Sequence, residues 1–510
     1  MEQFTALVTW PDAPLTDSLV RDSLASLHPS PVIVTSLSEE LTASPGNLLQ
    51  WSNYDAIDHE LTHAPPPGSK VLSSSYTIRK ALIRKHYLSR CFHNYLTKHP
   101  DSPLSRAAPK TWELDISFAD ELDEMWSDDL WDLGEELDKD GSDKWWLLKP
   151  GMTERGMGIR LFRTKDELAR IFESFEQDDD AEEGEDGDDQ QQNDTSVATS
   201  QLRHFVIQEY LSQPLLLDPS EVPLKGQQKP ASPQDLRGHK FHLRVYCVAS
   251  GALTIYMYTR MLALFSATPY VALTADRDGG DDFDVNEDLA AHLTNTSLQT
   301  ERGEAGVRLF DELIGCHVLS PSPATADEHS AQAAHSKPQP QVSRAMGEAL
   351  DADAVPAARN EEAEGKHNFQ EESVLSTEDV EDIKSQIAEV LAETFKAALD
   401  MSVHFQPLPN AFEFYGIDFL VSHSETSGAR RYQVHLLEVN SEPAIELTGP
   451  RLTWILEDVF RAMGKVCVEP FFRNTGEAET EALGEAWEVG QTRHELRKCL
   501  EMQVRGLRGW

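Results

Sequence analysis

The side chains best suited to chemistry lie in one late stretch, residues 412–447, which reads FEFYGIDFLVSHSETSGARRYQVHLLEVNSEPAIEL. Two apolar runs separated by a polar connection predict two strands joined by a turn. Side chains alternate along a strand, so Glu438 and Asn440 are expected on one face and Leu437 on the other. In a hairpin, Asp418 can join that first face. Two carboxylates and an amide there would form a hard-oxygen site, suited to Mg²⁺ that also holds nucleotide phosphates.

The simpler interpretation of these three residues is a solvated strand face, because polar side chains within strands usually point to water. Apolar neighbours such as Phe419 and Leu436 instead indicate strands buried on both faces. A carboxylate buried there needs a compensating charge, and a cation would supply it. The hairpin alone leaves both interpretations open, so the choice between them depends on the segments that precede it.

A second candidate site is Lys149, which ends an apolar strand and is followed by a loop with Gly151, Gly156 and Gly158. Glycines allow a backbone to turn tightly and to surround phosphate oxygens with N–H groups, while the lysine adds a positive charge. The spacing matches neither the dinucleotide fingerprint nor the P-loop. An ordinary turn is the alternative interpretation.

Two further segments place polar groups on extended chain. The candidates are Gln208, Glu209, Tyr210 and Leu211 in VIQEYL, then Lys240, His242 and Arg244 in KFHLR, with Arg260 at the end of the following strand. The first segment could offer its backbone to an adenine edge, and the second alternates its cations onto one face. A plain strand end and an exposed sheet edge would explain the same patterns.

The elements expected to carry these groups alternate between strands and helices. Strands are predicted at 4–10, 145–149, 204–210, 241–249 and 252–261, and helices at 73–96, 165–175 and 452–463. Ser376 is expected to cap a long amphipathic helix before the hairpin. The helix at 73–96 has a basic stripe that includes Arg79, Lys80, Arg84 and Lys85; a solvated face and a contact with phosphate or an acidic partner are both open.

Composition limits the classes of partner. The 510-residue chain carries a net charge of −42, and residues 112–144 hold fourteen acids against two lysines. Such a surface disfavours direct nucleic-acid binding. Five scattered cysteines fit reduced thiols, and no secretory signal or membrane-spanning stretch is apparent, which predicts a soluble cytoplasmic protein with no membrane partner.

Seven segments are predicted from shifts in composition. They are an N-terminal α/β domain (1–110), an acidic aromatic-containing segment (111–144), a central part (145–265) with a disordered insertion (176–200), a connecting part (266–320), a second disordered insertion (321–372), a C-terminal part with the oxygen site (373–470) and a C-terminal helical extension (471–510).

Taken in order, WLLKPGMTERGMGIRLF, VIQEYL, KFHLRVYCV, the Arg260 segment, FYGIDFL and LLEVNSEPAIEL resemble the tubulin-tyrosine ligase family of ATP-grasp ligases. The resemblance covers roughly residues 140–265 and 375–465. It implies an α/β (α+β) ATP-grasp fold, with two α/β lobes around an ATP cleft and a small N-terminal α/β domain. Six ordered motifs are a far more specific signal than any one of them.

The resemblance also implies a role for each candidate. Lys149, Gly151, Gly156 and Gly158 would hold ATP phosphates, Gln208 to Leu211 would form the adenine hinge, and His242 would contact the nucleotide. Lys240, Arg244 and Arg260 would face the phosphates and the acceptor carboxylate, and Asp418, Glu438 and Asn440 would hold Mg²⁺. ATP would phosphorylate a carboxylate, and the amine of an amino acid would then displace phosphate. The acceptor would be tubulin or another acidic protein tail.

One position departs from the family pattern, because His242 stands where the family usually has aspartate. The KFH version resembles a fungal-type branch that includes a processing-body-associated member. That branch implies an alternative role, a scaffold of mRNA-decay bodies with little or no ligase activity. The charge of −42 also makes the chain a poor long-range attractor for acidic tails.

Overall fold

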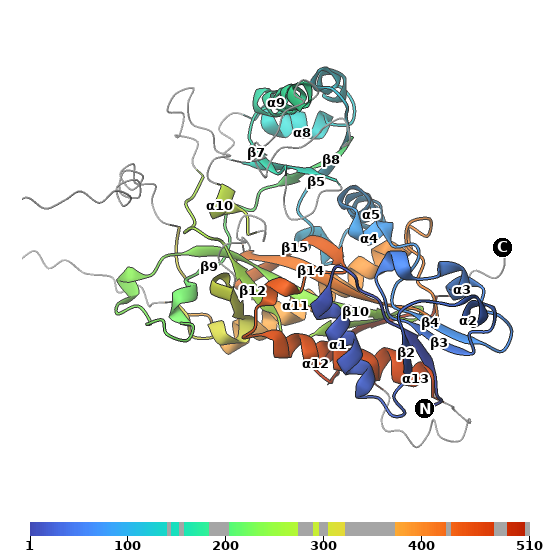
Figure 1. Ribbon diagram of the computed structural model, residues 1–510. Coiled ribbons are helices and arrows are strands. Elements are labelled where there is room, and N and C mark those ends of the chain that lie inside the picture. Colours follow the sequence, from blue (N-terminus) through green and yellow to red (C-terminus); the bar gives the residue numbers. More distant parts are fainter. Residues whose placement is uncertain are drawn as a thin grey trace, which may run out of the picture.

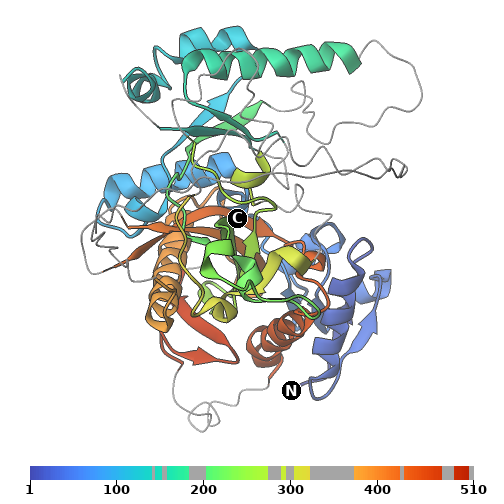
Figure 2. The same cartoon turned by 90° about the vertical axis from the view of Figure 1, so that its left-hand side faces the viewer.

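The computed structural model describes residues 1–139, 144–151, 158–182, 203–273, 289–294, 304–321, 373–424, 430–473 and 487–504. Three sheets organise this part of the chain. Figure 1 shows a small upper lobe above a large central sheet, with the N-terminal layer beside and below it. Figure 2, turned by 90°, shows helix α9 lying across the top of the upper lobe.

The N-terminal layer is a four-stranded parallel sheet in the order β2-β1-β3-β4. Its elements are β1 (Thr5–Leu7), α1 (Pro14–Ala25), β2 (Val32–Val34), α2 (Glu39–Ala43), β3 (Asn47–Gln50), α3 (His59–His63) and β4 (Lys70–Ser73). The next three helices, α4 (Lys80–Ile83), α5 (Lys85–Lys98) and α6 (Leu104–Ala107), belong instead to the core of the large sheet. Helix α1 begins with a proline, whose fixed φ suits a first helical turn. Its buried leucines join a core that includes α12.

The upper lobe is a four-stranded antiparallel sheet in the order β5-β8-β6-β7. Its elements are β5 (Thr111–Asp115), α7 (Leu122–Met125), α8 (Trp131–Leu137), β6 (Trp146–Pro150), β7 (Arg160–Phe162), α9 (Lys165–Glu182) and β8 (His204–Glu209). The acidic aromatic segment is therefore part of this lobe, because β5 pairs with β8 and the side chains of Leu122, Leu130 and Leu133 join its core.

The large sheet carries the long hairpin between two helical layers. Its elements are β9 (Leu216–Leu217), β10 (His239–Ser250), β11 (Thr254–Tyr258), β12 (Leu262–Phe265), α10 (Leu289–His292), β13 (Val307–Leu309), α11 (Thr377–Leu399), β14 (Phe412–His423), β15 (Tyr432–Ser441), α12 (Thr453–Met463), α13 (Glu469–Phe471), β16 (Thr492–Arg493) and β17 (Leu496–Glu501). Strand β14 lies between β10 and β15. Helix α11 belongs to the core on one side of the sheet and α12 to the core on the other.

Several predicted elements differ from those observed. The single helix predicted over 73–96 is wrong: Arg84 has an extended conformation and separates α4 from α5. Helix α9 continues beyond residue 175 into the segment for which disorder is predicted. The predicted C-terminal helical extension is wrong for residues 487–504, where β17 pairs with β11. Leu496 and Leu500 are buried there, so tertiary pairing decides the structure of this segment.

Other expectations are confirmed. The predicted hairpin forms as β14 and β15, and Ser376 caps α11 by accepting a hydrogen bond from the backbone N–H of Asp379. Residues 183–200 and 322–372 of the two predicted insertions, and Gly156, lie outside the described residues. Within the described part, no helix has the length and apolar character needed to span a bilayer.

Candidate active site

The predicted oxygen-bearing residues meet on the β14–β15 hairpin. Asp418 stands opposite Glu438 in the strand register, and the Asn440 side-chain amide donates a hydrogen bond of 3.2 Å to Glu438 Oε1. The register shifts beside this pair, because Phe419 pairs with Leu436 and leaves Leu437 in a β-bulge. Leu437 therefore lines the same pocket as Glu438 rather than the opposite face. Strict alternation failed here because a bulge re-aims a side chain.

Asp418 is held by cationic groups from the neighbouring strand β10. The carboxylate is 3% exposed and accepts hydrogen bonds from Arg244 Nε at 2.5 Å and Arg244 Nη2 at 3.0 Å. His242 Nε2 lies 3.6 Å from Asp418 Oδ1, and this buried nitrogen makes no hydrogen bond within the described structure. His242 Nδ1 is 2.6 Å from Thr294 Oγ1, which orients the ring. The paired guanidinium compensates the buried charge of Asp418.

Glu438 is paired with a lysine that was not predicted as a site residue. Lys85 Nζ, at the first position of α5, lies 3.5 Å from Glu438 Oε2. Burial opposes ionisation of Glu438, but Lys85, the Asn440 hydrogen bond and Lys149 outweigh it and lower its pKa to about 2. Glu438 is therefore an anion at neutral pH. In the sequence, Lys85 was visible only as part of the basic stripe. The break in the helix at Arg84 places Lys85 beside Glu438.

Two buried lysines face the carboxylates from the two lobes. Lys149 Nζ on β6 donates a hydrogen bond of 2.5 Å to Gln208 Oε1, and Lys240 Nζ on β10 lies 4.3 Å from the centre of the Tyr210 ring. Burial lowers the pKa of Lys149 to about 8. Burial, followed by repulsion from Lys149, lowers the pKa of Lys240 to about 7. Both lysines therefore favour a negatively charged ligand.

These groups share a narrow pocket between the lobes, with a volume of about 60 Å³. The predicted residues among its lining are Lys149, Gln208, Glu209, Tyr210, Leu211, Lys240, His242, Asp418 and Glu438. Lining residues missed at the sequence level include Lys85, His292, Leu293 and Thr294. The last three come from α10 and the residues after it. Their polar groups contact the predicted site: His292 Nδ1 is 2.9 Å from Tyr210 Oη.

Arg260 is not among the residues that line this pocket. Its Nη2 lies 3.2 Å from Glu495 Oε1, and its guanidinium lies 5.1 Å from the centre of the Trp454 ring.

Gly151 follows β6 and donates its N–H to His204 O at 2.7 Å, where an added Cβ would lie 2.8 Å from that same oxygen. Gly158 has a φ of +72°, which suits glycine.

The two lobes and the phosphate-suited pocket between them define an ATP-grasp protein. Over 98% of its length, the chain matches 99% of a solved chain with a TM-score of 0.57 and 27% identity. That structure is described as the C-terminal domain of K. lactis Pby1, an ATP-grasp enzyme interacting with the mRNA decapping enzyme Dcp2. The likeness shows the predicted fold class.

The chain belongs to the tubulin-tyrosine ligase family, whose profile matches residues 74–370 and 355–475. It is 33% identical over 446 residues to Saccharomyces cerevisiae "Probable tubulin--tyrosine ligase PBY1", covering 85% of this chain and 48% of that one. A Schizosaccharomyces pombe protein, also named as a probable tubulin–tyrosine ligase, is 32% identical over 438 residues, 84% of each chain. The chain thus spans about half the length of the S. cerevisiae relative.

Proposed function

We propose that this protein is an ATP- and Mg²⁺-dependent ligase that joins an amino acid to a protein carboxylate. The observation that carries the proposal is the opposition of Asp418 and Glu438 to Lys149 and Lys240 within one pocket between the lobes. Anionic oxygens on one side and lysines on the other suit a metal-bound polyphosphate. The family membership supports the same reaction class.

The residues present fit a magnesium ion. Asp418 and Glu438 offer carboxylate oxygens and Asn440 an amide oxygen, the hard donors that Mg²⁺ prefers. No group of three or more His, Cys, Asp or Glu side chains in the described ranges is arranged to hold a metal. When bound, the ion would neutralise phosphate charge. Arg244 and Lys85 balance the carboxylates without it.

ATP would lie along the strands of both lobes. The end of β8 and the residues after it, 208–211, would offer the adenine its backbone, and Lys149 and Lys240 would contact phosphates. The buried His242 Nε2, which lacks a hydrogen bond in the described structure, faces the same space.

The chemistry needs positioning and charge neutralisation rather than a protein nucleophile. A carboxylate oxygen of the acceptor attacks the γ-phosphorus, and ADP leaves. The amine of the amino acid then attacks the acyl carbon, phosphate leaves, and the amine loses a proton as the amide forms. The two lysines stabilise the negative charge that develops on the phosphate oxygens, while Arg244 holds Asp418 in position. The acceptor we propose is tubulin or another acidic tail.

Glu438→Gln is expected to abolish acceptor-dependent ADP release, because the amide removes a metal ligand and its charge. We expect a loss of at least about a hundredfold. ADP release is measured with amino acids and acceptor peptides in the presence of Mg²⁺. The matched control is Glu173→Gln, an exposed carboxylate on α9. Full turnover by Glu438→Gln would contradict the proposal.

A second candidate function is a binding platform for mRNA-decay proteins in cytoplasmic processing bodies. It is favoured by the K. lactis neighbour, whose description names the decapping enzyme Dcp2 as its partner. A platform should keep its partners after Glu438→Gln and show no acceptor-dependent turnover. Pull-down and ADP release measured on the same variant therefore separate the two functions.

A further inference from the structure

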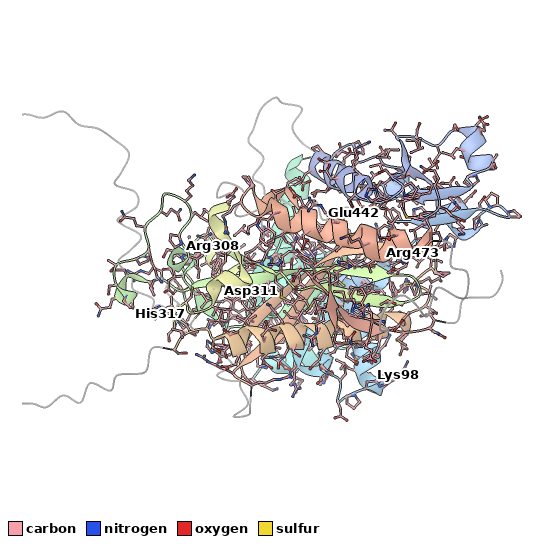
Figure 3. The ribbon with its side chains drawn as sticks, turned by 90° about the horizontal axis from the view of Figure 1, so that it is seen from below. Lys98, Arg308, Asp311, His317, Glu442 and Arg473 are labelled. Carbon is pink, nitrogen blue, oxygen red and sulfur yellow. The ribbon has the colours of Figure 1, made fainter. Side chains whose placement is uncertain are left out.

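The loop that follows β15 is bound to the N-terminal layer through the side chain of Glu442. Glu442 is the first residue after β15, and its Oε1 accepts a hydrogen bond of 2.8 Å from the backbone N–H of Tyr54, which follows β3. Figure 3 shows Glu442 beside α12, at the side of that helix that faces the N-terminal layer. The contact therefore joins two segments that lie far apart in the sequence.

The backbone of Glu442 has a conformation that side chains other than glycine rarely adopt. Its φ is +50°, and the other described non-glycine residues with a positive φ are His494 and Glu495. Packing does little to hold it, because the side chain is 37% exposed and residues 442–446 line a cavity of about 470 Å³. Such a conformation persists only where other contacts hold it, and the hydrogen bond from Tyr54 is such a contact.

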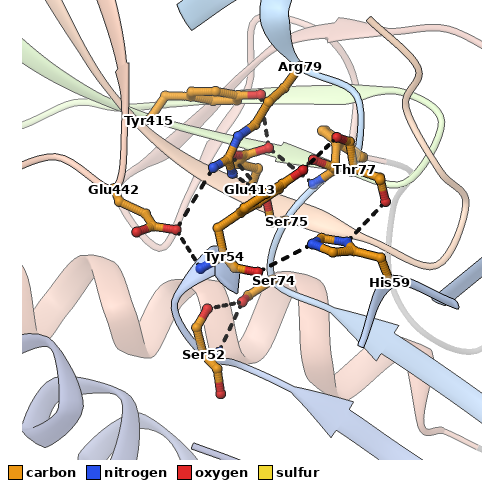
Figure 4. A network of polar contacts seen from close by, with 11 residues as sticks. Ser52, Tyr54, His59, Ser74, Ser75, Thr77, Arg79, Glu413, Tyr415 and Glu442 are labelled. Atoms are coloured by element: carbon orange, nitrogen blue, oxygen red, sulfur yellow. Dashed lines mark hydrogen bonds and ion pairs between the residues drawn. The ribbon is translucent and has the colours of Figure 1, made fainter. Parts of the chain in front are cut away.

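The surface that receives Glu442 is built around a buried ion pair. The guanidinium of Arg79 is paired with Glu413 and donates a hydrogen bond to Ser75. Its Nη2 lies 3.9 Å from Glu442 Oε1, and its carbon lies 4.1 Å from the centre of the Tyr54 ring. Figure 4 shows these five residues from close by, and we call them the Arg79 network. Because the central charges are paired and buried, the network is a fixed support for the loop.

Both oxygens of the proposed metal ligand Glu438 contact groups that are anchored in this network. Asn440, two residues before Glu442, donates its amide hydrogen to Glu438 Oε1. Lys85, whose Nζ lies 3.5 Å from Glu438 Oε2, follows Arg79 in the chain after the single turn of α4. The position of the Glu438 carboxylate is therefore linked to the Arg79 network from two sides.

The residue after Glu442 reaches the support of the second carboxylate. Pro443 covers Gly416 of β14, where an added Cβ would lie 2.6 Å from the proline Cβ and 3.2 Å from Arg244 Cδ. Pro443 and Arg244 thus meet over one glycine, and Arg244 donates two hydrogen bonds to Asp418. A loop that leaves its place would remove this cover from beside Arg244.

We propose that Glu442 is a positioning residue for the magnesium site. By accepting the hydrogen bond from Tyr54, it holds Asn440 and Pro443 in the arrangement that presents Glu438 and Asp418 to one pocket. Glu442 itself does not line that pocket and acts through its neighbours in the chain. The inference rests on the metal site of the proposed function and adds a residue that the site depends on.

The test measures binding of Mn²⁺, which takes the same oxygen ligands as Mg²⁺, from the EPR signal of the free ion. The full chain carries a charge of −42 and binds cations elsewhere too, so the site is defined as the binding that Glu438→Gln removes. Glu442→Ala is expected to weaken this binding at least about tenfold, as losses of outer supporting contacts do at metal sites. Glu442→Gln should bind like the unmodified chain, because its amide oxygen can still accept the hydrogen bond.

Two further variants separate positioning from stability. Glu442→Gly should melt at a higher temperature than Glu442→Ala, because glycine adopts a positive φ without strain, yet bind Mn²⁺ as weakly. The matched control is Glu495→Ala. Glu495 has a φ of +58°, accepts a hydrogen bond of 2.7 Å from Thr259 Oγ1 and lies outside the pocket lining. This control should lower the melting temperature and leave Mn²⁺ binding unchanged.

Unchanged Mn²⁺ affinity in Glu442→Ala, or full affinity in Glu442→Gly, would overturn the inference and leave the metal site standing. If Glu442→Ala does not fold, the comparison of Glu442→Gly with Glu442→Gln decides, and equal affinities would overturn the inference. Absence of Glu438-dependent Mn²⁺ binding in the unmodified chain would refute the metal site and the inference together. The expected Mn²⁺ pattern without ADP release under any condition would refute the ligase alone.

Discussion

Replacing Arg244 with methionine is expected to destabilise the fold by about 3–5 kcal/mol when magnesium is absent. The side chains of Arg244 and Asp418 are 12% and 4% exposed, and the guanidinium makes two hydrogen bonds to the carboxylate. Without the arginine, a buried negative charge loses its main partner, because His242 Nε2 is 3.6 Å away. The midpoint of urea unfolding, measured in EDTA, reports the loss.

Two companion measurements make this prediction specific. If Asp418 is a magnesium ligand, millimolar Mg²⁺ should restore part of the stability lost in Arg244→Met, because the ion replaces the missing charge. The double variant Arg244→Met/Asp418→Leu should also regain stability, since neither charge remains. The control Arg461→Met, which removes an exposed pair with Glu457, should cost less than about 1 kcal/mol. A comparable cost in Arg461→Met and Arg244→Met would contradict our account of the buried pair.

Much of the candidate site could be predicted because its residues lie on regular strands. Alternation along β10 and β14 places Lys240, His242 and Asp418 in one pocket without knowledge of the wider fold. Arg244 follows the same alternation and reaches the site through Asp418. Strands buried on both faces leave carboxylates in need of partners, and the structure supplies those partners from β10 and α5.

The parts that sequence alone could not give depend on contacts between distant segments. Lys85 reaches Glu438 because the helix breaks at Arg84, and a helical periodicity does not show that break. Leu437 turns into the pocket at a bulge, which strict alternation excludes. Strand β17 forms because it pairs with β11, more than two hundred residues earlier in the chain. Local propensity carries no information about such pairing.

ATP binding is expected to take up protons between pH 8 and pH 9. In the free protein, burial and then repulsion from Lys149 lower the pKa of Lys240 to about 7, and burial lowers the pKa of Lys149 to about 8. Lys240 is therefore mostly neutral at pH 8, and Lys149 is about half protonated. Polyphosphate stabilises the charged form of both lysines and so raises both pKa values. Protonation and binding are linked, so the affinity must fall as pH rises.

If binding takes up one proton, the ATP affinity is expected to fall about tenfold for each unit rise in pH. Near pH 9, where both lysines contribute, the fall approaches about a hundredfold per unit. The phosphates themselves have finished titrating by pH 8, so they do not add to the slope. Calorimetry in two buffers of different ionisation enthalpy counts the protons directly. Lys240→Met should remove close to one proton from the uptake, whereas Lys98→Met, which alters an exposed pair with Asp400, should leave it unchanged. Binding that is independent of pH across this range would show that these lysines do not contact the phosphates.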